Sequence, residues 1–410
     1  MNKHRVVITG LGCISALGLD LNAFWHRLIA GESGISDIKN VSCEDLRFKN
    51  GAEVADYDEN KYFERSELSW MDRFAQFALI AASEAIADAK LSAMDINGTD
   101  TAVITGACLG GRQTEDTGYY RVYRENKKTV APNIIPNTMI NAGASHISTK
   151  FGITGPVFTF STACSSSSHA IGHAFWMIRN GMVNRAITGG SEAPFCFAML
   201  KAWDALRVVT SGICRPFSKN RNGMVLGEGG AMLVLESLSS ALERNAKIYA
   251  EITGFGMSSD AGHITNPSSA GQLLAMQSAL NDAAIAPSSI QYINAHGTGT
   301  IMNDQIETQS IRAFFPSAHD HLLVSSTKAA HGHLLGATGA IEAIATILAI
   351  KNAMVPPTIN FMEKDNECDL PMVVNQAVSH DINYALSSSF AFGGLNAILL
   401  FKKYDGRYAN

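Results

Sequence analysis

Hydrophobic and polar positions alternate in blocks along the chain, and the blocks predict strands that alternate with helices. Short apolar runs of strand length stand at 5–9, 101–105 and 157–161. Longer segments with apolar residues at helical spacing lie between them, at 21–30 and 71–90. This alternation is typical of α/β proteins whose sheets are mainly parallel and covered by helices on both faces.

The same alternation continues to the C-terminus, with a weak internal repeat. Further helices and strands are predicted, with helices at 271–285, 303–314 and 336–351, and strands at 291–294, 322–326, 383–389 and 395–402. Ile-Thr-Gly-x-Gly at 8–12 recurs at 252–256. A chain of this length is too long for one small core, so we expect two halves that share a core.

Three stretches lack a clear period, at 40–66, 112–135 and 194–217, and we expect irregular structure in them. The second is rich in Tyr, Arg and Lys and is predicted to form a long loop or short helices over a surface. An insertion of this length in a compact domain is more often functional or interfacial than idle.

The composition fits a large globular protein, since 46% of the 410 residues are hydrophobic and 17% are charged. A net charge of −5, with no run of more than two Lys or Arg residues, argues against nucleic-acid binding.

The longest apolar run, 336–350, contains Glu342 and is too short to span a bilayer. Seven cysteines without a CxxC spacing imply neither a disulfide framework nor a zinc ribbon. Because no leader-like apolar segment follows Met1, we expect a soluble protein of the reducing cytoplasm.

One cysteine stands where a buried strand is expected to turn into a buried helix. Cys164 follows the strand at 157–161, and the helix after it, at 165–180, has no side chain of certain charge before Arg179. Unpaired N–H groups and the positive end of the helix dipole favour the thiolate, the nucleophilic form, at such a position. A lone buried cysteine is more often a packing residue, so its role depends on partners elsewhere in the chain.

Three later segments supply such partners. They are 294–300 with His296, 328–339 with His333, and 390–396 with Phe392. Together with Cys164 they resemble, in order and spacing, the β-ketoacyl-[acyl carrier protein] synthases of the thiolase superfamily, especially the type II elongating enzymes. The resemblance extends from residue 5 to residue 403.

The resemblance implies a fold and a reaction. The fold is the thiolase fold, an α/β architecture of five layers, α-β-α-β-α, built from two related halves: residues 1–247 with the nucleophilic cysteine, and residues 248–410 with two catalytic histidines. The reaction is the decarboxylative Claisen condensation of an acyl group held on Cys164 with malonyl-[acyl carrier protein]. No metal or cofactor is implied, because the substrates are carried on the phosphopantetheine of the carrier protein.

The resemblance also assigns catalytic roles. His296 and His333 match the two active-site histidines of the family, which can stabilise the enolate charge formed when CO₂ is lost. Lys328 matches a lysine that orders this region through carboxylates, for which Glu307 and Glu342 stand at the corresponding positions. We expect Lys328 to act electrostatically and not as a nucleophile.

Further residues are assigned to the oxyanion hole, the gate and the substrate. The backbone N–H groups of Cys164 and Phe392 match the family's oxyanion hole, and Phe392 also matches a gating phenylalanine on a glycine-containing loop. The expected substrate contacts are Thr298 and Thr300 at the pantetheine arm, Leu109 at the bottom of the acyl channel, and Phe390 and Gly393 beside the gate. Simple packing is an equal alternative for Leu109.

Other histidines are kept outside the catalytic set. His169 and His173 have the i, i+4 spacing of two zinc ligands, but no third ligand or HExxH glutamate accompanies them. We therefore expect core histidines and no metal site. His331 is expected to neighbour the site, and His263 to be structural or close to the channel.

Departures from the usual motifs of the family point to a specialised enzyme. The gate loop reads Ala-Phe-Gly-Gly-Leu-Asn at 391–396, and the basic cluster that docks acidic carriers reads Arg-Ser-Glu-Leu-Ser-Trp at 65–70. The segments 201–207 and 214–218 resemble aryl-polyene and nodulation-type ketosynthases. We therefore favour a specialised type II polyketide or polyene pathway over housekeeping fatty-acid elongation, with the carrier attracted elsewhere on the surface.

Three related proteins are alternatives. A non-catalytic chain-length factor loses the active cysteine, which this chain keeps together with His296 and His333. A thiolase uses a second cysteine where this chain has the 390–396 loop, and a cysteine hydrolase uses a Cys-His-Asn arrangement.

The expected partners are an acyl carrier protein and a second subunit near 106–135, either an identical chain or a chain-length factor. Neither nucleic acid nor a membrane is expected as a partner.

Overall fold

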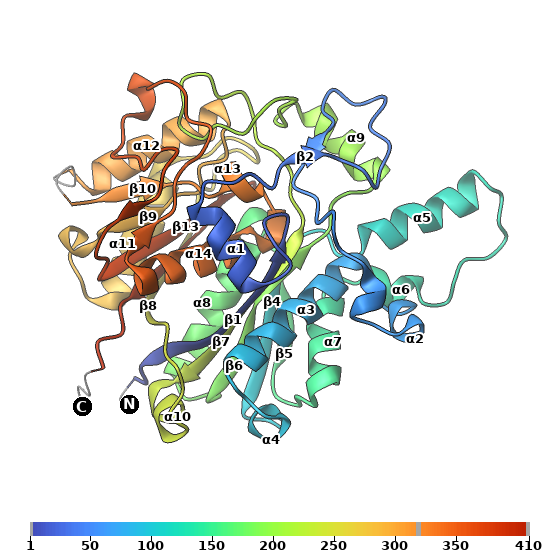
Figure 1. Cartoon of the computed structure of the whole chain (residues 1–410), viewed down its shortest axis with the longest axis horizontal. Coiled ribbons are helices and arrows are strands. Elements are labelled where there is room, and N and C mark those ends of the chain that lie inside the picture. The colour runs from blue at the N-terminus through green and yellow to red at the C-terminus, as the bar shows by residue number, and fades with distance from the viewer. Residues whose placement is uncertain (1–2, 317–320, 407–410) are drawn as a thin grey trace.

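Ten strands of the protein form two related half-sheets (Figure 1), in a computed structural model that describes residues 3–316 and 321–406. Met1, the residue from which the absence of a leader-like segment was predicted, lies outside the described residues. The first half-sheet contains β1 (Val6–Ser15), β4 (Thr101–Gly106), β5 (Val157–Phe160), β6 (Arg185–Glu192) and β7 (Gly229–Ser237). The second contains β8 (Ala250–Ser259), β9 (Tyr292–Asn294), β10 (Leu323–Ser325), β13 (Tyr384–Ala391) and β14 (Leu395–Lys402).

Both half-sheets have the same strand order. Counted along the chain within each half, the order from the centre outward is first, fifth, fourth, second and third strand. The two first strands, β1 and β8, pair antiparallel with Val6 opposite Ile252, which joins the half-sheets into one. The Ile-Thr-Gly-x-Gly repeat lies in these two strands, so the sequence echo has a structural counterpart.

The strands are mixed in direction, so the prediction of mainly parallel sheets is wrong. β4 runs parallel to β5 and β6, and β9 runs parallel to β10 and β13. In contrast, β7 and β14 run antiparallel to both of their neighbours. Alternating apolar blocks mark strands and helices, but the connection decides the direction of a strand. The tight turn at 392–394, for example, reverses the chain between β13 and β14.

Helices form three layers around the two half-sheets (Figure 1). α3 (Arg73–Asp88) and α7 (Ala142–Phe151) pack on the outer face of the first, and α11 (Ser269–Ala283), with α12 (Ile301–Phe314) beside it, covers the second. α8 (Ser166–Arg179) and α14 (Thr338–Asn352) lie between the half-sheets and contact strands of both. The predicted five-layered α-β-α-β-α fold is therefore confirmed.

The central helices are largely buried, α14 almost completely and α8 over most of its length. Every residue of α14 from Thr338 to Ile350 is buried, and Glu342 is the one charged residue among them. α8 has ten of its residues buried, from Ser166 to Ile178. A helix without a polar face is stable only inside a protein, which agrees with the position of both helices between the sheets.

Helices also occur in two stretches that were predicted to be irregular. The 112–135 stretch contains α5 (Arg112–Tyr123) and leads into α6 (Ile134–Thr138). Both are short helices, one of the two structures predicted for this stretch. The 194–217 stretch contains α9 (Phe197–Leu206), which the prediction missed. Leu200 is the one buried residue of α9, so its apolar residues do not form the stripe by which a helix is detected.

Both central helices begin at a strained turn. A 3₁₀ turn, η2 (Ala163–Ser165), precedes α8, and another, η5 (Leu335–Ala337), precedes α14; the two turns contact each other. Ala163 has a φ of 51° and Leu335 has a φ of 48°, left-handed values that cost a residue with a side chain on the order of 1–3 kcal/mol. Residues next to these turns, one from each half, are therefore brought together.

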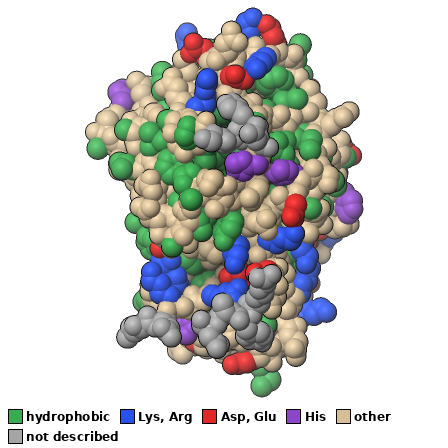
Figure 2. All heavy atoms as spheres, turned by 90° about the vertical axis from the view of Figure 1, so that its left-hand side faces the viewer, with side chains coloured by type: hydrophobic (Ala, Val, Ile, Leu, Met, Phe, Trp, Pro, Cys, Tyr) green, Lys and Arg blue, Asp and Glu red, His purple; other side chains and the backbone are tan. Residues whose placement is uncertain are grey.

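Charges are mixed on the face that forms the left-hand side of Figure 1. Figure 2 shows Lys and Arg side chains interspersed with Asp and Glu there, and hydrophobic side chains scattered among polar atoms. Opposite charges at such spacing offset one another beyond a distance of about 10 Å. Among the described residues, no helix combines the length and the apolar character needed to cross a membrane.

Candidate active site

A cavity of about 250 Å³ contains residues of all four predicted motifs. Its wall includes Cys164 from η2, His296 after β9, and His333 after α13 (Lys328–His331). Phe390 and Phe392, at the end of β13, close another side. The cavity therefore draws its wall from both halves of the chain.

Cys164, His296 and His333 converge at one point of this cavity. Sγ of Cys164 and one ring nitrogen of each histidine lie within 4.8 Å of one another. The two imidazole rings are perpendicular, with centroids 5.5 Å apart, and all three side chains are buried. One substrate atom at this point can therefore contact the sulfur and both imidazoles.

Burial and hydrogen bonding oppose each other at the Cys164 thiol. Loss of solvation raises the pKa of Cys164 to about 11, while the ammonium of Lys328 and the N–H groups of Phe392 and Cys164 itself act to lower that pKa. The cysteine does stand just before a helix, as predicted. The expectation of a low thiol pKa is nevertheless wrong, because burial outweighs the helix terminus and the thiol keeps its proton at neutral pH.

Hydrogen bonds determine which nitrogen of His333 carries the proton. Nδ1 accepts the N–H of Leu335 at 3.0 Å and lies 2.9 Å from Oγ1 of Thr338. A main-chain N–H can only donate, so Nδ1 is unprotonated and the proton of the neutral ring is on Nε2. Burial and the nearby Lys328 hold the pKa of His333 well below its usual value, so the ring is neutral and its Nε2–H is a donor.

The same hydrogen bonds argue against a metal at this point. Among the residues that the structure describes, Cys164, His296 and His333 are the one group of His, Cys, Asp and Glu ligand atoms close enough to hold an ion. A metal ligated by Nε2 of His333 would require the proton to move to Nδ1, where the N–H of Leu335 already points. The arrangement therefore favours hydrogen-bond donation over metal binding.

His296 is positioned through its main chain. Glu307 accepts the N–H of His296 at 2.7 Å and that of Gly297 at 2.8 Å. Burial, with a smaller effect of Lys328, holds the pKa of His296 well below its usual value. Its buried Nδ1 has no hydrogen-bond partner among the described residues, so this neutral ring, unlike that of His333, has no hydrogen bond at Nδ1 to fix its tautomer.

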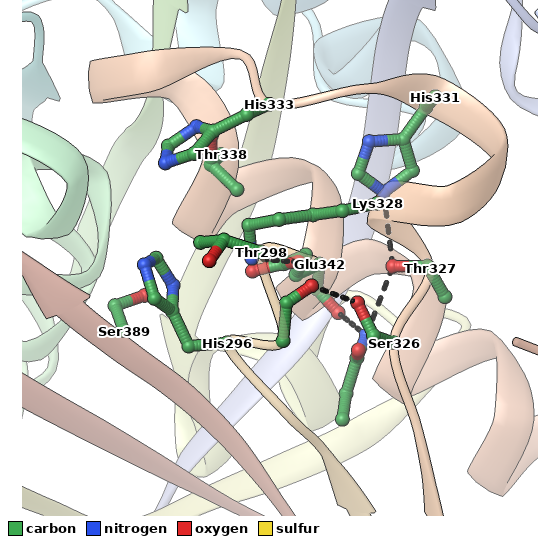
Figure 3. Close-up of polar contacts among 12 residues, drawn as sticks. His296, Thr298, Ser326, Thr327, Lys328, His331, His333, Thr338, Glu342 and Ser389 are labelled. Carbon is green, nitrogen blue, oxygen red and sulfur yellow. Dashed lines mark hydrogen bonds and ion pairs between the residues drawn. The ribbon is translucent and has the colours of Figure 1, made fainter. Parts of the chain in front are cut away.

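Lys328 is the electrostatic centre of the site (Figure 3). Its buried Nζ lies 2.5 Å from Oε1 of Glu342, and its charge lowers the pKa of Cys164, His296 and His333 alike. In Figure 3, His296 and His333 lie at one end of the Lys328 side chain and His331 at the other. Of the two expected carboxylates, Glu342 is the ion-pair partner, whereas Glu307 holds the main chain at His296.

The remaining predicted residues divide into wall and surroundings. Thr298 and Thr300 line the cavity, with their hydroxyl oxygens 2.9 Å apart. Leu109 and Gly393 are not part of its wall. Leu109 packs against the apolar cluster that contains Met224 and Leu335, and Gly393 donates its N–H to the carbonyl of Ile264 at 2.7 Å.

The other histidines have local partners. Nδ1 of His169 lies 3.0 Å from Oγ1 of Thr162, and Nδ1 of His173 lies 2.9 Å from the carbonyl of His169. His331 is buried between Thr327 and the carbonyl of Gly332, and His263 is exposed. Within the described part of the chain, none of these histidines joins a metal-ligand group.

Glu192 and Trp203 are among the residues of the site that were not predicted. Glu192, fully buried at the end of β6, accepts the N–H groups of Cys108 at 2.8 Å and Gly336 at 3.1 Å, and so ties the loop after β4 to η5. An acidic residue two positions after a glycine pair, at the end of a buried strand, was the available signal. Trp203 lines the cavity from α9, the helix that the prediction missed.

Comparisons with known proteins agree with this geometry. The β-ketoacyl synthase N-terminal domain model matches residues 3–241, and the β-ketoacyl synthase C-terminal domain model matches residues 249–362. The chain is 40% identical to 3-oxoacyl-[acyl-carrier-protein] synthase 2 of Staphylococcus aureus (strain N315) and 40% identical to nodulation protein E of Rhizobium sp. (strain N33), each over 98% of this chain and 99% of the relative. A solved structure, the ishigamide ketosynthase/chain length factor, is similar with a TM-score of 0.94 and 33% identity, over 98% of this chain and 100% of that chain.

Proposed function

Because this chain belongs to the β-ketoacyl synthase family, we propose that it is an acyltransferase that condenses an acyl group held on Cys164 with malonyl-[acyl carrier protein]. The observation that carries the proposal is the convergence of the Cys164 sulfur and two neutral imidazoles within 4.8 Å. The products are CO₂ and a 3-oxoacyl thioester two carbons longer than the acyl group. The chemistry uses no cofactor beyond the phosphopantetheine of the carrier.

The first step transfers the acyl group from a carrier thioester to Cys164. The sulfur attacks the thioester carbonyl, and the N–H groups of Phe392 and Cys164, which point toward this sulfur, stabilise the oxyanion that forms. Since the thiol is protonated at neutral pH, its proton has to leave as the sulfur–carbon bond forms. The departing pantetheine thiolate takes up this proton, so the step leaves no net charge behind.

The second step removes CO₂ from the malonyl thioester and forms the carbon–carbon bond. Loss of CO₂ leaves an enolate, whose oxygen accepts hydrogen bonds from Nε2–H of His333 and from the ring of His296. The carbanion then attacks the acyl carbonyl on Cys164, and the tetrahedral intermediate expels the sulfur as a thiolate, which regains a proton from solvent. Lys328 supplies positive charge throughout without contacting the reacting atoms.

We assign the remaining predicted roles on the same basis. Thr298 and Thr300 bind the pantetheine arm, Phe392 gates the cavity, and Phe390 and Gly393 support the gate. Leu109 borders the acyl chain only when the apolar cluster around it opens. The nucleophile belongs to a half formed by residues 1–247 and the histidines to a half formed by 248–410.

The second subunit, an identical chain or a chain-length factor, is proposed to cover the face formed by α5, α6 and β5. β5 is the outermost strand of its half-sheet, and Phe158 on it is 37% exposed. Tyr123, Ile135 and Met139 on or near α5 and α6 are also exposed. An unpaired strand edge next to large exposed apolar side chains is costly for a lone chain, and a second subunit removes this cost.

Intact-mass measurement tests the proposal. Wild-type enzyme incubated with acyl carriers should gain the mass of one acyl group, and Cys164→Ser should not. His296→Ala should still be acylated but should form no 3-oxoacyl product with malonyl carrier. Cys13→Ala, a change at a buried cysteine of β1, should keep both activities. Undiminished acyl transfer to the Cys164→Ser protein contradicts the proposal.

The pathway is tested with the same assay. We propose a specialised type II polyketide or polyene pathway, because the 201–207 segment and the gate loop depart from the housekeeping motifs. Unsaturated or 3-oxo acyl groups should then turn over faster than saturated acyl groups of the same length. A preference for saturated groups favours fatty-acid elongation instead.

A further inference from the structure

An aromatic pair links α9 to the loop next to the nucleophile. The rings of Trp203 and Phe392 are stacked, with centroids 6.4 Å apart and planes inclined by 25°. Both side chains line the cavity that contains Cys164. Stacked aromatic pairs are worth about 0.5–1.5 kcal/mol beyond the area that they bury.

Trp203 stands on an anchored support. The neighbouring Asp204 forms an ion pair with Arg47, with 3.0 Å between Oδ1 and Nε. Nζ of Lys201 donates to the carbonyl of Asp45 at 2.9 Å, and the indole packs against the apolar cluster around Leu200. These contacts fix α9 at points on either side of the indole.

Phe392 stands at the start of the glycine turn that joins β13 to β14. Gly393 and Gly394, with φ values of 85° and 69°, follow it in the left-handed region, which glycine adopts without strain. The same residue also carries the N–H that points toward the Cys164 sulfur. A displacement of the Phe392 ring therefore displaces an oxyanion-hole donor as well.

We propose that Trp203 is a positioning residue, the fixed face against which Phe392 closes. The inference rests on the proposed function and adds a residue to it. With the ring of Phe392 against the indole, its N–H is directed at Cys164 and the acyl thioester is shielded from water. Without the indole, the closed position loses its support, the oxyanion-hole donor is misplaced for part of the time, and water reaches the thioester.

Two rates test this role: hydrolysis of the acyl group from Cys164 without malonyl carrier, and condensation with it. In Trp203→Ala, hydrolysis should be about 2- to 10-fold faster and condensation slower by a similar factor, which is what the stacking energy corresponds to. Trp203→Leu, which fills space without a flat ring, should behave like the Ala variant. Trp203→Phe, which keeps a ring, should restore both rates to within about 2-fold. Leu274→Ala, at a side chain of α11 that is 62% exposed, is the control.

The outcomes separate the two proposals. Wild-type rates in Trp203→Ala, or equal defects in the Phe and Ala variants, overturn the role of Trp203 while the reaction itself stands. Absence of any acyl group on wild-type Cys164 overturns the proposed function and this inference with it. Faster hydrolysis in the Ala and Leu variants only, with near-wild-type thermal unfolding, supports the inference.

Discussion

Replacing Lys328 by Met should destabilise the protein by an amount that depends on pH. The ammonium is buried and lies 2.5 Å from Glu342, which is buried as well. Burial raises the pKa of Glu342 to about 7, and Lys328 opposes that rise. In Lys328→Met the opposing charge is gone, so the pKa of Glu342 rises further and its carboxyl group is left without a countercharge.

The expected magnitude follows from the burial of the pair. Removing one partner of a buried ion pair costs about 3–5 kcal/mol. An unfolding entropy of about 2.1 cal/mol/K per residue gives roughly 0.9 kcal/mol/K for 410 residues, so the melting temperature should fall by about 4–6 °C. A carboxyl whose pKa is raised by folding stabilises the fold while it is protonated and loses that contribution as pH rises through the folded pKa. The penalty should therefore be smaller near about pH 6 than near about pH 8.5.

Thermal unfolding of four proteins measures this effect: wild type, Lys328→Met, Glu342→Gln and the double variant, each at both pH values. The double variant has no unpaired charge, so its loss should be smaller than the sum of the single losses by about 1–3 kcal/mol. Additive losses, or a Lys328→Met penalty that is the same at both pH values, refute the electrostatic role assigned to this lysine.

Three further predictions concern the nucleophile and its support. Because burial raises the pKa of Cys164 to about 11, the alkylation of Cys164 by iodoacetamide should accelerate about tenfold per pH unit from about pH 7 to about pH 9; a plateau near neutrality contradicts this. Glu192 accepts three main-chain N–H groups, and Glu192→Gln leaves an amide with one acceptor atom in its place. The free energy of unfolding should therefore fall by about 2–3 kcal/mol, as measured by thermal unfolding. The control Glu363→Gln, at an exposed ion pair, should change it by less than about 0.5 kcal/mol. Gly106→Ala would put a Cβ 2.2 Å from the nitrogen of Ser167 in α8 and should greatly reduce acylation of Cys164. The control Gly212→Ala, where the nearest atom is 3.5 Å away, should not reduce it. Normal acylation of the Gly106 variant would falsify the packing argument.

The sequence predicted the elements of the fold more reliably than their directions. Strand and helix positions follow from apolar runs of strand or helix length, as in β4 and α14, and from helical spacing of apolar residues, as in 21–30. β7 and β14 run antiparallel to their neighbours because of the connections that precede them, and the sequence of a connection has no hydrophobic period from which a strand direction could be predicted. α9 escaped detection because Leu200 alone is buried on it, and with α9 the prediction missed Trp203.

The site was predictable in its residues but not in its electrostatics. Position alone suggested Cys164, while His296 and His333 were assigned through the resemblance to a family, since nothing in their spacing indicates that they meet. The thiol pKa was predicted with the wrong sign because a helix terminus can be inferred from sequence, whereas complete burial of the sulfur depends on tertiary packing. The proton on Nε2 of His333 likewise depends on one N–H, that of Leu335.

The matching turns at Ala163 and Leu335 have a consequence for how this protein can change. Each turn follows the third strand of its half-sheet, so the pocket lies where the amino ends of the two central helices approach each other. Part of the positive potential felt by an anionic intermediate is then a property of the duplicated backbone. Side chains around the pocket can be exchanged for others of different shape, and the potential from the backbone remains.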